Sequence, residues 1–145
     1  MKQVDVLKAP LAAVFLLSGS AAFADVSPAD VWGDWKTQMV GYGYEISASE
    51  SMSGPDLKVT DVEMRVAIPD DGGDVTVKLP GMTFHDNGDG TVAIQLPSIL
   101  PLDIAVAAED EDPVNIRVNY TTTGLAMIAS GAPDSITYTY SAASM

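Results

Sequence analysis

A two-residue alternation of apolar and polar side chains runs from about Leu57 to Tyr140 and limits the possible folds more than any other feature of the sequence. Side chains on a β-strand point to opposite faces in turn, so each alternating segment is expected to have one apolar and one polar face. The sequence therefore predicts a mostly β protein whose sheet is apolar on one side. The alternation is clearest over residues 62–68, 92–96, 102–106, 114–120 and 136–140.

The segments between the predicted strands have the composition of tight turns. They are short and rich in Gly, Asn, Asp and Pro, which supply the backbone angles that hairpin turns need. Links of this length exclude parallel crossovers, so we expect an antiparallel meander. In a meander, alternate turns share one end, which would bring the acidic turns at 53–56, 86–90, 109–112 and 131–134 together. The predicted strands cover residues 44–52, 57–68, 74–85, 91–97, 101–108, 113–121, 124–130 and 135–142.

One helix is expected before the strands. Ser27 suits the N-cap, and the proline after it suits the first helical position. Trp32 and Trp35 lie on one stripe at helical spacing, and Gly41 or Gly43 is expected to end the helix. The predicted fold class is α+β, mostly β: one N-terminal amphipathic helix packed on a curved antiparallel meander sheet of about 7–8 strands.

Residues 1–24 have the pattern of a cleaved signal peptide. Lys2 and Lys8 precede an apolar stretch at 9–17, and the segment ends in Ala-Phe-Ala. The apolar stretch is shorter than the roughly 20 residues that a membrane-spanning helix needs. We therefore expect a periplasmic protein whose mature part, residues 25–145, is a single mostly β domain without a transmembrane span.

The charge balance restricts the possible partners. The chain has 20 acidic and 7 basic residues, with a formal net charge of −13. Nucleic acids and anionic lipid surfaces attract proteins through patches of Lys and Arg, so we expect no nucleic-acid partner. The chain has no Cys, so its stability must come from packing rather than from disulfides.

The sequence offers little for catalysis or metal binding, and we expect neither an enzyme nor a cofactor. His85 is the sole His, and a hydroxyl nucleophile needs both a base and a group that orients it. The weak metal candidates are Asp86, Asn87 and Asp89, which resemble part of an EF-hand loop. Leu96 stands where that loop needs its bidentate Glu, so we interpret the segment as a hairpin turn.

The predicted helix is too small to cover the apolar side of the predicted sheet. Eight strands at about 4.8 Å spacing make a sheet nearly 40 Å wide, whereas a helix of about 14 residues is about 21 Å long. The sheet must therefore curl, pair with another copy, continue into further sequence or hold an apolar ligand. The chain ends directly after a predicted strand, which favours the interpretation that 25–145 is the N-terminal part of a larger protein.

Several local motifs carry a family resemblance. Residues 25–26 (DV), 30–36 (DVWGDWK), 41–44 (GYGY) and 87–92 (NGDGTV) are similar to the N-terminal part of an uncharacterised alphaproteobacterial exported family, a domain of unknown function. Members of that family are generally several times longer than this chain. The resemblance implies export to the periplasm and carries no established activity.

Two functions are compatible with these features. The first is a non-enzymatic periplasmic protein that cradles a lipid or another hydrophobic ligand on a curved sheet. The second is a structural or assembly module whose sheet is completed by a missing C-terminal part, by a second copy or by another envelope protein. The residues expected to line the cavity or the contact surface are Trp32, Trp35, Val118, Tyr120, Leu125, Met127, Tyr138 and Tyr140.

Overall fold

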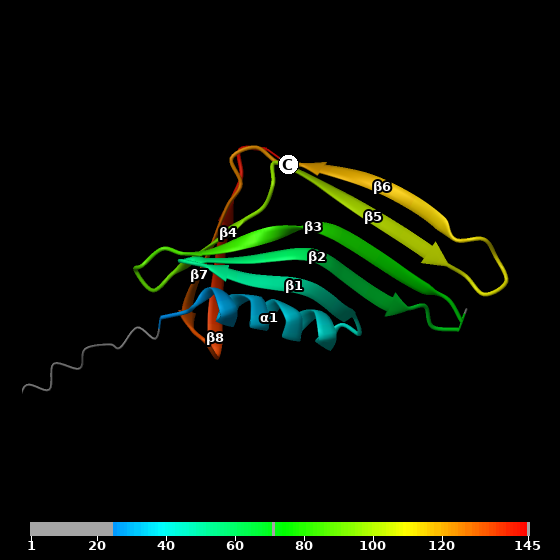
Figure 1. Ribbon diagram of the computed structural model, residues 1–145, viewed down its shortest axis with the longest axis horizontal. Helices are drawn as coiled ribbons and strands as arrows, with labels where there is room; N and C mark the ends of the chain where they lie inside the picture. Colours follow the sequence, from blue (N-terminus) through cyan, green and yellow to red (C-terminus); the bar gives the residue numbers. More distant parts are fainter. Residues whose placement is uncertain (1–24, 71, 145) are drawn as a thin grey trace, which may run out of the picture.

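The computed structural model describes residues 25–70 and 72–144, so the predicted signal peptide at 1–24 lies outside the described residues. The described chain forms one helix and eight strands that join in a single antiparallel sheet (Figure 1). The mostly β class is confirmed, and each predicted strand is present within two residues of its expected bounds. The elements are α1 (Pro28–Gly41), β1 (Glu45–Ser53), β2 (Asp56–Ala67), β3 (Asp74–Asp86), β4 (Val92–Gln95), β5 (Ile99–Ala107), β6 (Val114–Thr121), β7 (Ala126–Ala132) and β8 (Ser135–Ser141).

Helix α1 begins at the predicted N-cap Ser27, which forms a capping box with Asp30. The Ser27 hydroxyl accepts a hydrogen bond from the Asp30 backbone N–H at 3.2 Å, and the Asp30 carboxylate accepts one from the Ser27 N–H at 2.9 Å. These two bonds satisfy backbone donors that the first turn of a helix leaves free. The helix ends at Gly41, where the Tyr42 N–H donates to the carbonyls of Gln38 and Met39 at 3.1 Å.

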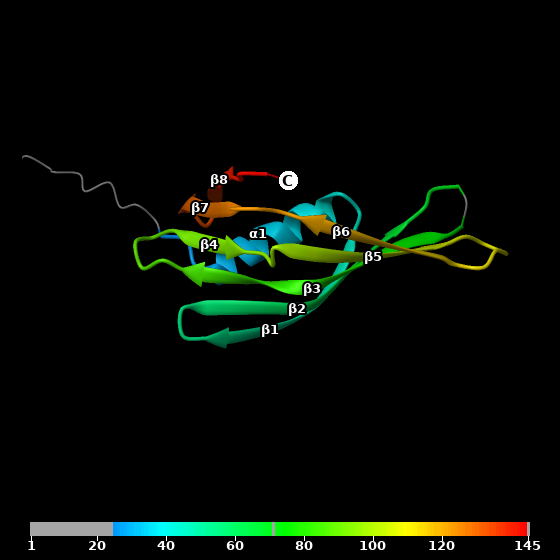
Figure 2. The same ribbon diagram turned by 90° about the horizontal axis from the view of Figure 1, so that it is seen from above.

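The strand order corrects the predicted meander. The sheet runs β1-β2-β3-β4-β7-β8, while β5 pairs with β3 and β6 pairs with β5. Both β4 and β5 therefore lie along the same side of β3, β4 beside Thr83–Asp86 and β5 beside Asp74–Lys78. Pro97 and Ser98 interrupt what would otherwise be one long strand, and Pro cannot donate a hydrogen bond to a sheet. The sheet consequently splits into two branches, β4-β7-β8 and β5-β6 (Figure 2).

The branching also separates the acidic turns that the meander would have gathered. Ala107, at the end of β5, lies opposite Asp74, so the turn at 109–112 is at the same end as the β2–β3 connection. The turn at 86–90 lies at the other end of β3, near Asp56 at the start of β2. The prediction is therefore wrong for the four acids at 109–112, because β5 runs along β3 instead of returning beside a new strand, whereas Asp56 does lie near the turn at 86–90.

Paired irregularities keep the apolar side of β2 and β3 facing one way. In β2 the buried residues step from Val59 to Val62 instead of by two, and Asp61 between them has a φ of 51°. In β3 the equivalent step lies between Met82 and Leu79, across Gly81 with a φ of 143°. Because a step of three would otherwise reverse the faces, these backbone conformations maintain one continuous apolar face.

The core lies between α1 and one half of this face. Phe84 is fully buried, and its ring centroid is 5.8 Å from that of Trp32 and 5.4 Å from that of Trp35. Tilted and edge-on arrangements of this kind suit the quadrupoles of aromatic rings. The buried apolar residues are Val26, Val31, Trp32, Leu57, Val59, Val62, Met82, Phe84, Val92, Ile94 and Ala129.

Replacing Gly81 with Ala should destabilise the fold by about 1–3 kcal/mol, since the positive φ strains any other residue. The added Cβ would also lie 2.6 Å from the Val59 carbonyl oxygen. Gly33→Ala is the matched control: a Cβ at this position in α1 meets nothing within 4 Å, so it should stabilise by about 0.5–1 kcal/mol. Urea unfolding of both variants tests the expectation. An unchanged midpoint for Gly81→Ala would contradict the proposed role of this glycine.

Candidate functional site

An apolar surface extends from the core along β2, β3, β5 and β6, and we call it the open apolar face. It continues the face that α1 packs against, because Val62 is buried in the core and Met64 and Val66 follow it at two-residue spacing. The apolar surface continues from β2 to β3, β5 and β6, since residues directly opposite one another on neighbouring strands share a face. The open apolar face comprises Met64, Val66, Val75, Val77, Leu100, Leu102, Ile104, Val106, Val114, Ile116, Val118 and Tyr120.

The register aligns these side chains in rows that cross the sheet. Met64 lies opposite Val77, Val77 opposite Ile104, and Ile104 opposite Ile116. A second row crosses the same four strands one pair further along and consists of Val66, Val75, Val106 and Val114. The apolar rows are therefore continuous from the half of the sheet beside the helix to the free edge at β6.

Helix α1 leaves the β5–β6 part of this face uncovered. Figure 1 shows β1, β2 and β3 arching over the helix, with β5 and β6 continuing beyond its C-terminal end. Val114, Ile116, Val118 and Tyr120 are 57%, 48%, 42% and 40% exposed. Adjacent apolar side chains with this exposure are typical of a surface that binds another molecule.

The opposite face of the same strands carries a row of alternating charges. It runs Glu63, Lys78, Asp103, Arg117 through directly opposed positions. Lys78 Nζ lies 3.4 Å from Glu63, and Arg117 donates two hydrogen bonds to Asp103 at 2.5 and 2.9 Å. The Arg117 guanidinium lowers the pKa of the Asp103 carboxyl. A hollow of about 450 Å³ lies over this row, but each charged side chain that lines it is already in an ion pair, Lys78 with Glu63 and Arg117 with Asp103.

The structure divides the sequence-predicted site residues between two places. Trp32 is buried, and Trp35, Met127 and Tyr138 pack against the same core. Val118 and Tyr120 lie on the open apolar face, in β6. Leu125, just before β7, is half-buried, and Tyr140 in β8 is 72% exposed.

Sequence reasoning missed the members of the open apolar face on the inner strands. Met64, Val77, Ile104 and Ile116 all belong to the alternating pattern, which was the available signal. The register that aligns them into a row joins residues far apart in the chain. Alternation gives the face of each side chain on its own strand, but not its neighbour on the next strand.

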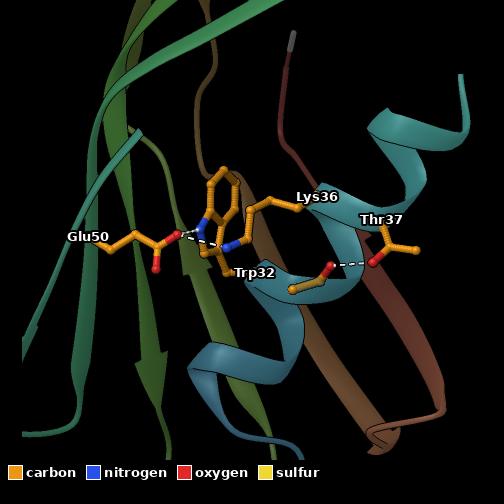
Figure 3. A network of polar contacts seen from close by, with 5 residues as sticks. Trp32, Lys36, Thr37 and Glu50 are labelled. Atoms are coloured by element: carbon orange, nitrogen blue, oxygen red, sulfur yellow. Dashed lines mark hydrogen bonds and ion pairs between the residues drawn. The ribbon is translucent and has the colours of Figure 1, made fainter. Parts of the chain in front are cut away.

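Trp32 and Lys36 on α1 share one acceptor on β1 (Figure 3). The Trp32 Nε1–H and the Lys36 ammonium both donate to Glu50 Oε1, at 2.5 and 2.8 Å. The Lys36 ammonium also lies 5.4 Å from the centroid of the Trp32 ring. Hydrogen bonds from Lys36 and then from Trp32 lower the pKa of Glu50. This network joins the helix to β1, which fixes the indole and leaves it unsuited to a ligand that needs an exposed ring.

Tyr138 has a similar structural role on the other branch. Its hydroxyl donates a hydrogen bond to Asp34 of α1 at 2.5 Å, and its ring lies 6.4 Å from that of Trp35. Burial, together with the neighbouring Asp34 carboxylate, raises the pKa of Tyr138 well above its ordinary value of 10.0. The contact joins β8 to the helix, so Tyr138 closes the core.

The side chains of the weak metal candidates, Asp86, Asn87 and Asp89, form hydrogen bonds within their own turn. Asp86 accepts a hydrogen bond from the Gly88 N–H at 2.8 Å, and Asp89 accepts bonds from the Thr91 N–H and hydroxyl at 3.0 and 2.6 Å. The Asn87 amide donates to the Thr91 hydroxyl at 3.0 Å. Within residues 25–70 and 72–144, no group of three His, Asp or Glu side chains is placed to hold a metal ion.

His85 pairs with Asp56, a neighbour that the sequence did not indicate. The two residues lie opposite each other on β3 and β2, with Nδ1 and Oδ1 2.6 Å apart. A carboxylate in this position orients an imidazole, as in a hydrolytic triad. In the described part of the chain no hydroxyl hydrogen-bonds to the other ring nitrogen, so the pair lacks the nucleophile of a triad.

No helix in the described part of the chain is long and apolar enough to cross a membrane. Comparison with protein-family models, curated proteins and solved structures gives no match. The resemblance to an exported family therefore stays a prediction.

Replacing Glu50 with Gln should lower the free energy of unfolding at pH 7 by up to about 1 kcal/mol, because the network is partly exposed. The folded-state pKa of Glu50 is depressed, so its stabilising effect is present above the unfolded value of 4.5 and is lost as the pH falls through the folded value. The difference from wild type should therefore shrink below about pH 4.5. Urea unfolding at pH 7 and pH 3.5 tests this, with Glu111→Gln in an exposed turn as the control. A difference that does not depend on pH would contradict the assignment.

Proposed function

We propose that the protein is a non-enzymatic periplasmic protein that holds a lipid or another hydrophobic ligand on its open apolar face. The observation that carries the proposal is the continuous row Met64, Val77, Ile104, Ile116, which leads from the helix-covered core to an exposed edge. Burying apolar surface of this kind stabilises a complex by about 25 cal/mol per Å² before the costs of association.

The arrangement of the sheet supports a hydrophobic ligand over a polar one. The strands arch over α1 (Figure 1). The open apolar face continues the surface that the helix already covers. The charges on the reverse face are paired across the strands, as in Arg117 with Asp103. A ligand on the open apolar face would therefore replace water over apolar side chains without displacing an ion pair.

A second candidate function is that of an assembly module whose sheet is completed by a partner chain. It is favoured by β6, which pairs only with β5 among the described strands and has every residue exposed. An unpaired strand edge offers backbone hydrogen bonds to another strand.

The proposed compartment rests on residues 1–24, with their two lysines, apolar stretch and Ala-Phe-Ala ending. Expression of the full chain in a Gram-negative host should release a protein that begins at Asp25 into the periplasmic fraction. Intact-mass measurement of that fraction tests the expectation. Retention of the full-length mass in the cytoplasm would contradict it.

Ligand binding can be tested with two substitutions on neighbouring residues that face opposite sides of β6. Val114→Glu places a charge on the open apolar face and should weaken binding about tenfold or more, since burying a valine contributes about 1.5–3 kcal/mol. Asn115→Glu adds the same charge to the reverse face and should leave binding unchanged. Val114 is 57% exposed, so both variants should fold. The probe is a long-chain fatty acid with an environment-sensitive fluorophore. Failure of wild type to bind it, or equal loss in both variants, would contradict the proposal.

A further inference from the structure

Strand β6 is an edge without the usual protection against pairing. Proteins protect exposed strand edges with charges, prolines, bulges or very short strands. Strand β1 has a bulge between Ser47 and Ser49 and carries Glu45 on its exposed side. In β6 there is no proline, and its single charge, Arg117, is already bound by Asp103 on the inner neighbour β5.

We propose that β6 pairs antiparallel with β6 of a second copy of this chain, with the two Val118 residues opposite each other on a two-fold axis. A symmetric dimer uses the same surface on both copies, so that surface must be complementary to itself. Strand β6 meets this condition because one face of it is apolar and the other carries Asn115, Arg117, Asn119 and Thr121. The inference rests on the second candidate function and deepens it, since it names a second copy of this chain as the partner that completes the sheet at β6; it does not depend on a ligand.

The side chains select the register. Apolar residues of one copy must lie opposite apolar residues of the other, or the two sheet faces would be reversed. A two-fold axis at Arg117 would place two guanidinium groups opposite each other, which is unfavourable. An axis at Ile116 would leave only residues 114–118 of each strand in the pairing. With the axis at Val118, residues 115–121 pair, Ile116 lies opposite Tyr120, and Arg117 lies opposite Asn119.

The distribution of charge favours the antiparallel direction. The turn at 109–112 is Glu-Asp-Glu-Asp and lies directly before β6, in a chain with a net charge of −13. Parallel pairing would place the two acidic turns side by side, whereas antiparallel pairing puts them at opposite ends of the joined strands. Residues 114–121 contain no acidic side chain, so the pairing itself brings no carboxylates together.

The dimer would join the two open apolar faces. Ile116 ends the row that begins at Met64, and in the proposed register Tyr120 of the second copy continues it. On the reverse face, Asn119 of the second copy would continue the charged row beyond Arg117. Each copy would then extend the sheet of the other while the apolar face stays available to a ligand.

The chain contains no Cys, so single cysteines can test the register. Directly opposed residues in an antiparallel pair have Cα atoms about 4.5–5.5 Å apart, within the range of a disulfide. Val118→Cys should form a disulfide-linked dimer under mild oxidation in most of the protein. Ile116→Cys, on the same exposed face, should remain mostly unlinked because it lies opposite Tyr120. Both positions are more than 40% exposed, so neither substitution should prevent folding.

The mass of the wild-type protein provides the second measurement. Analytical ultracentrifugation should show a dimer, and Val118→Lys should convert it to a monomer, whereas Ser47→Lys on the β1 edge should leave it dimeric. A monomeric wild type, equal cross-linking of the two cysteine variants, or cross-linking of Ile116→Cys alone would overturn the proposal. Val114 lies outside the paired residues, so Val114→Glu should lose the fatty-acid probe and keep the dimer. That difference separates a failure of the dimer from a failure of ligand binding.

Discussion

The packing of Trp32 and Trp35 on Phe84 is the contact on which the rest of the structure depends. It fixes α1 over one half of β3 and brings in Glu50 of β1 and Tyr138 of β8 through hydrogen bonds to the helix. The aromatic cluster thus holds both the first and the last strand of the sheet. The cost of this arrangement is that a single short helix leaves the other half of the apolar face open.

Strand β3 is long enough to belong to both branches of the sheet, so it connects the core with the open half of the apolar face. One end of β3 pairs with β4 and belongs to the helix-covered branch, while the other end pairs with β5 and leads to β6. The core and the open apolar face are therefore parts of one continuous surface. On the reverse side, the charges of the row that ends at Arg117 are already paired with one another across the strands. The apolar side is therefore the surface that favours binding of a hydrophobic ligand.

Sequence reasoning predicted the strands and the helix well and the site only in part. The Ser27 cap, the glycine at the helix end and the alternating segments are local signals, and they placed each element within two residues. Trp32 and Trp35 were placed on one helical stripe and among the residues that line the cavity or the contact surface, and they pack on Phe84. The prediction failed at the topology, because the interruption at Pro97 was interpreted as a turn between neighbouring strands of a meander. Because the topology was wrong, the turn at 109–112 was placed at the wrong end of the sheet, and the inner residues of the open apolar face, such as Val77 and Ile104, were missed.

The sequence by itself determined that this chain is mostly β, that its sheet is apolar on one side and that one short helix could not cover that side. These three properties follow from the spacing of residues that are near one another in the chain, because successive side chains on a strand point to opposite faces. Only the tertiary structure decided which half of the apolar side is exposed and that β6 forms a free edge. Those properties depend on the pairing of residues far apart in sequence, such as Val77 with Ile104, and no local pattern specifies that register.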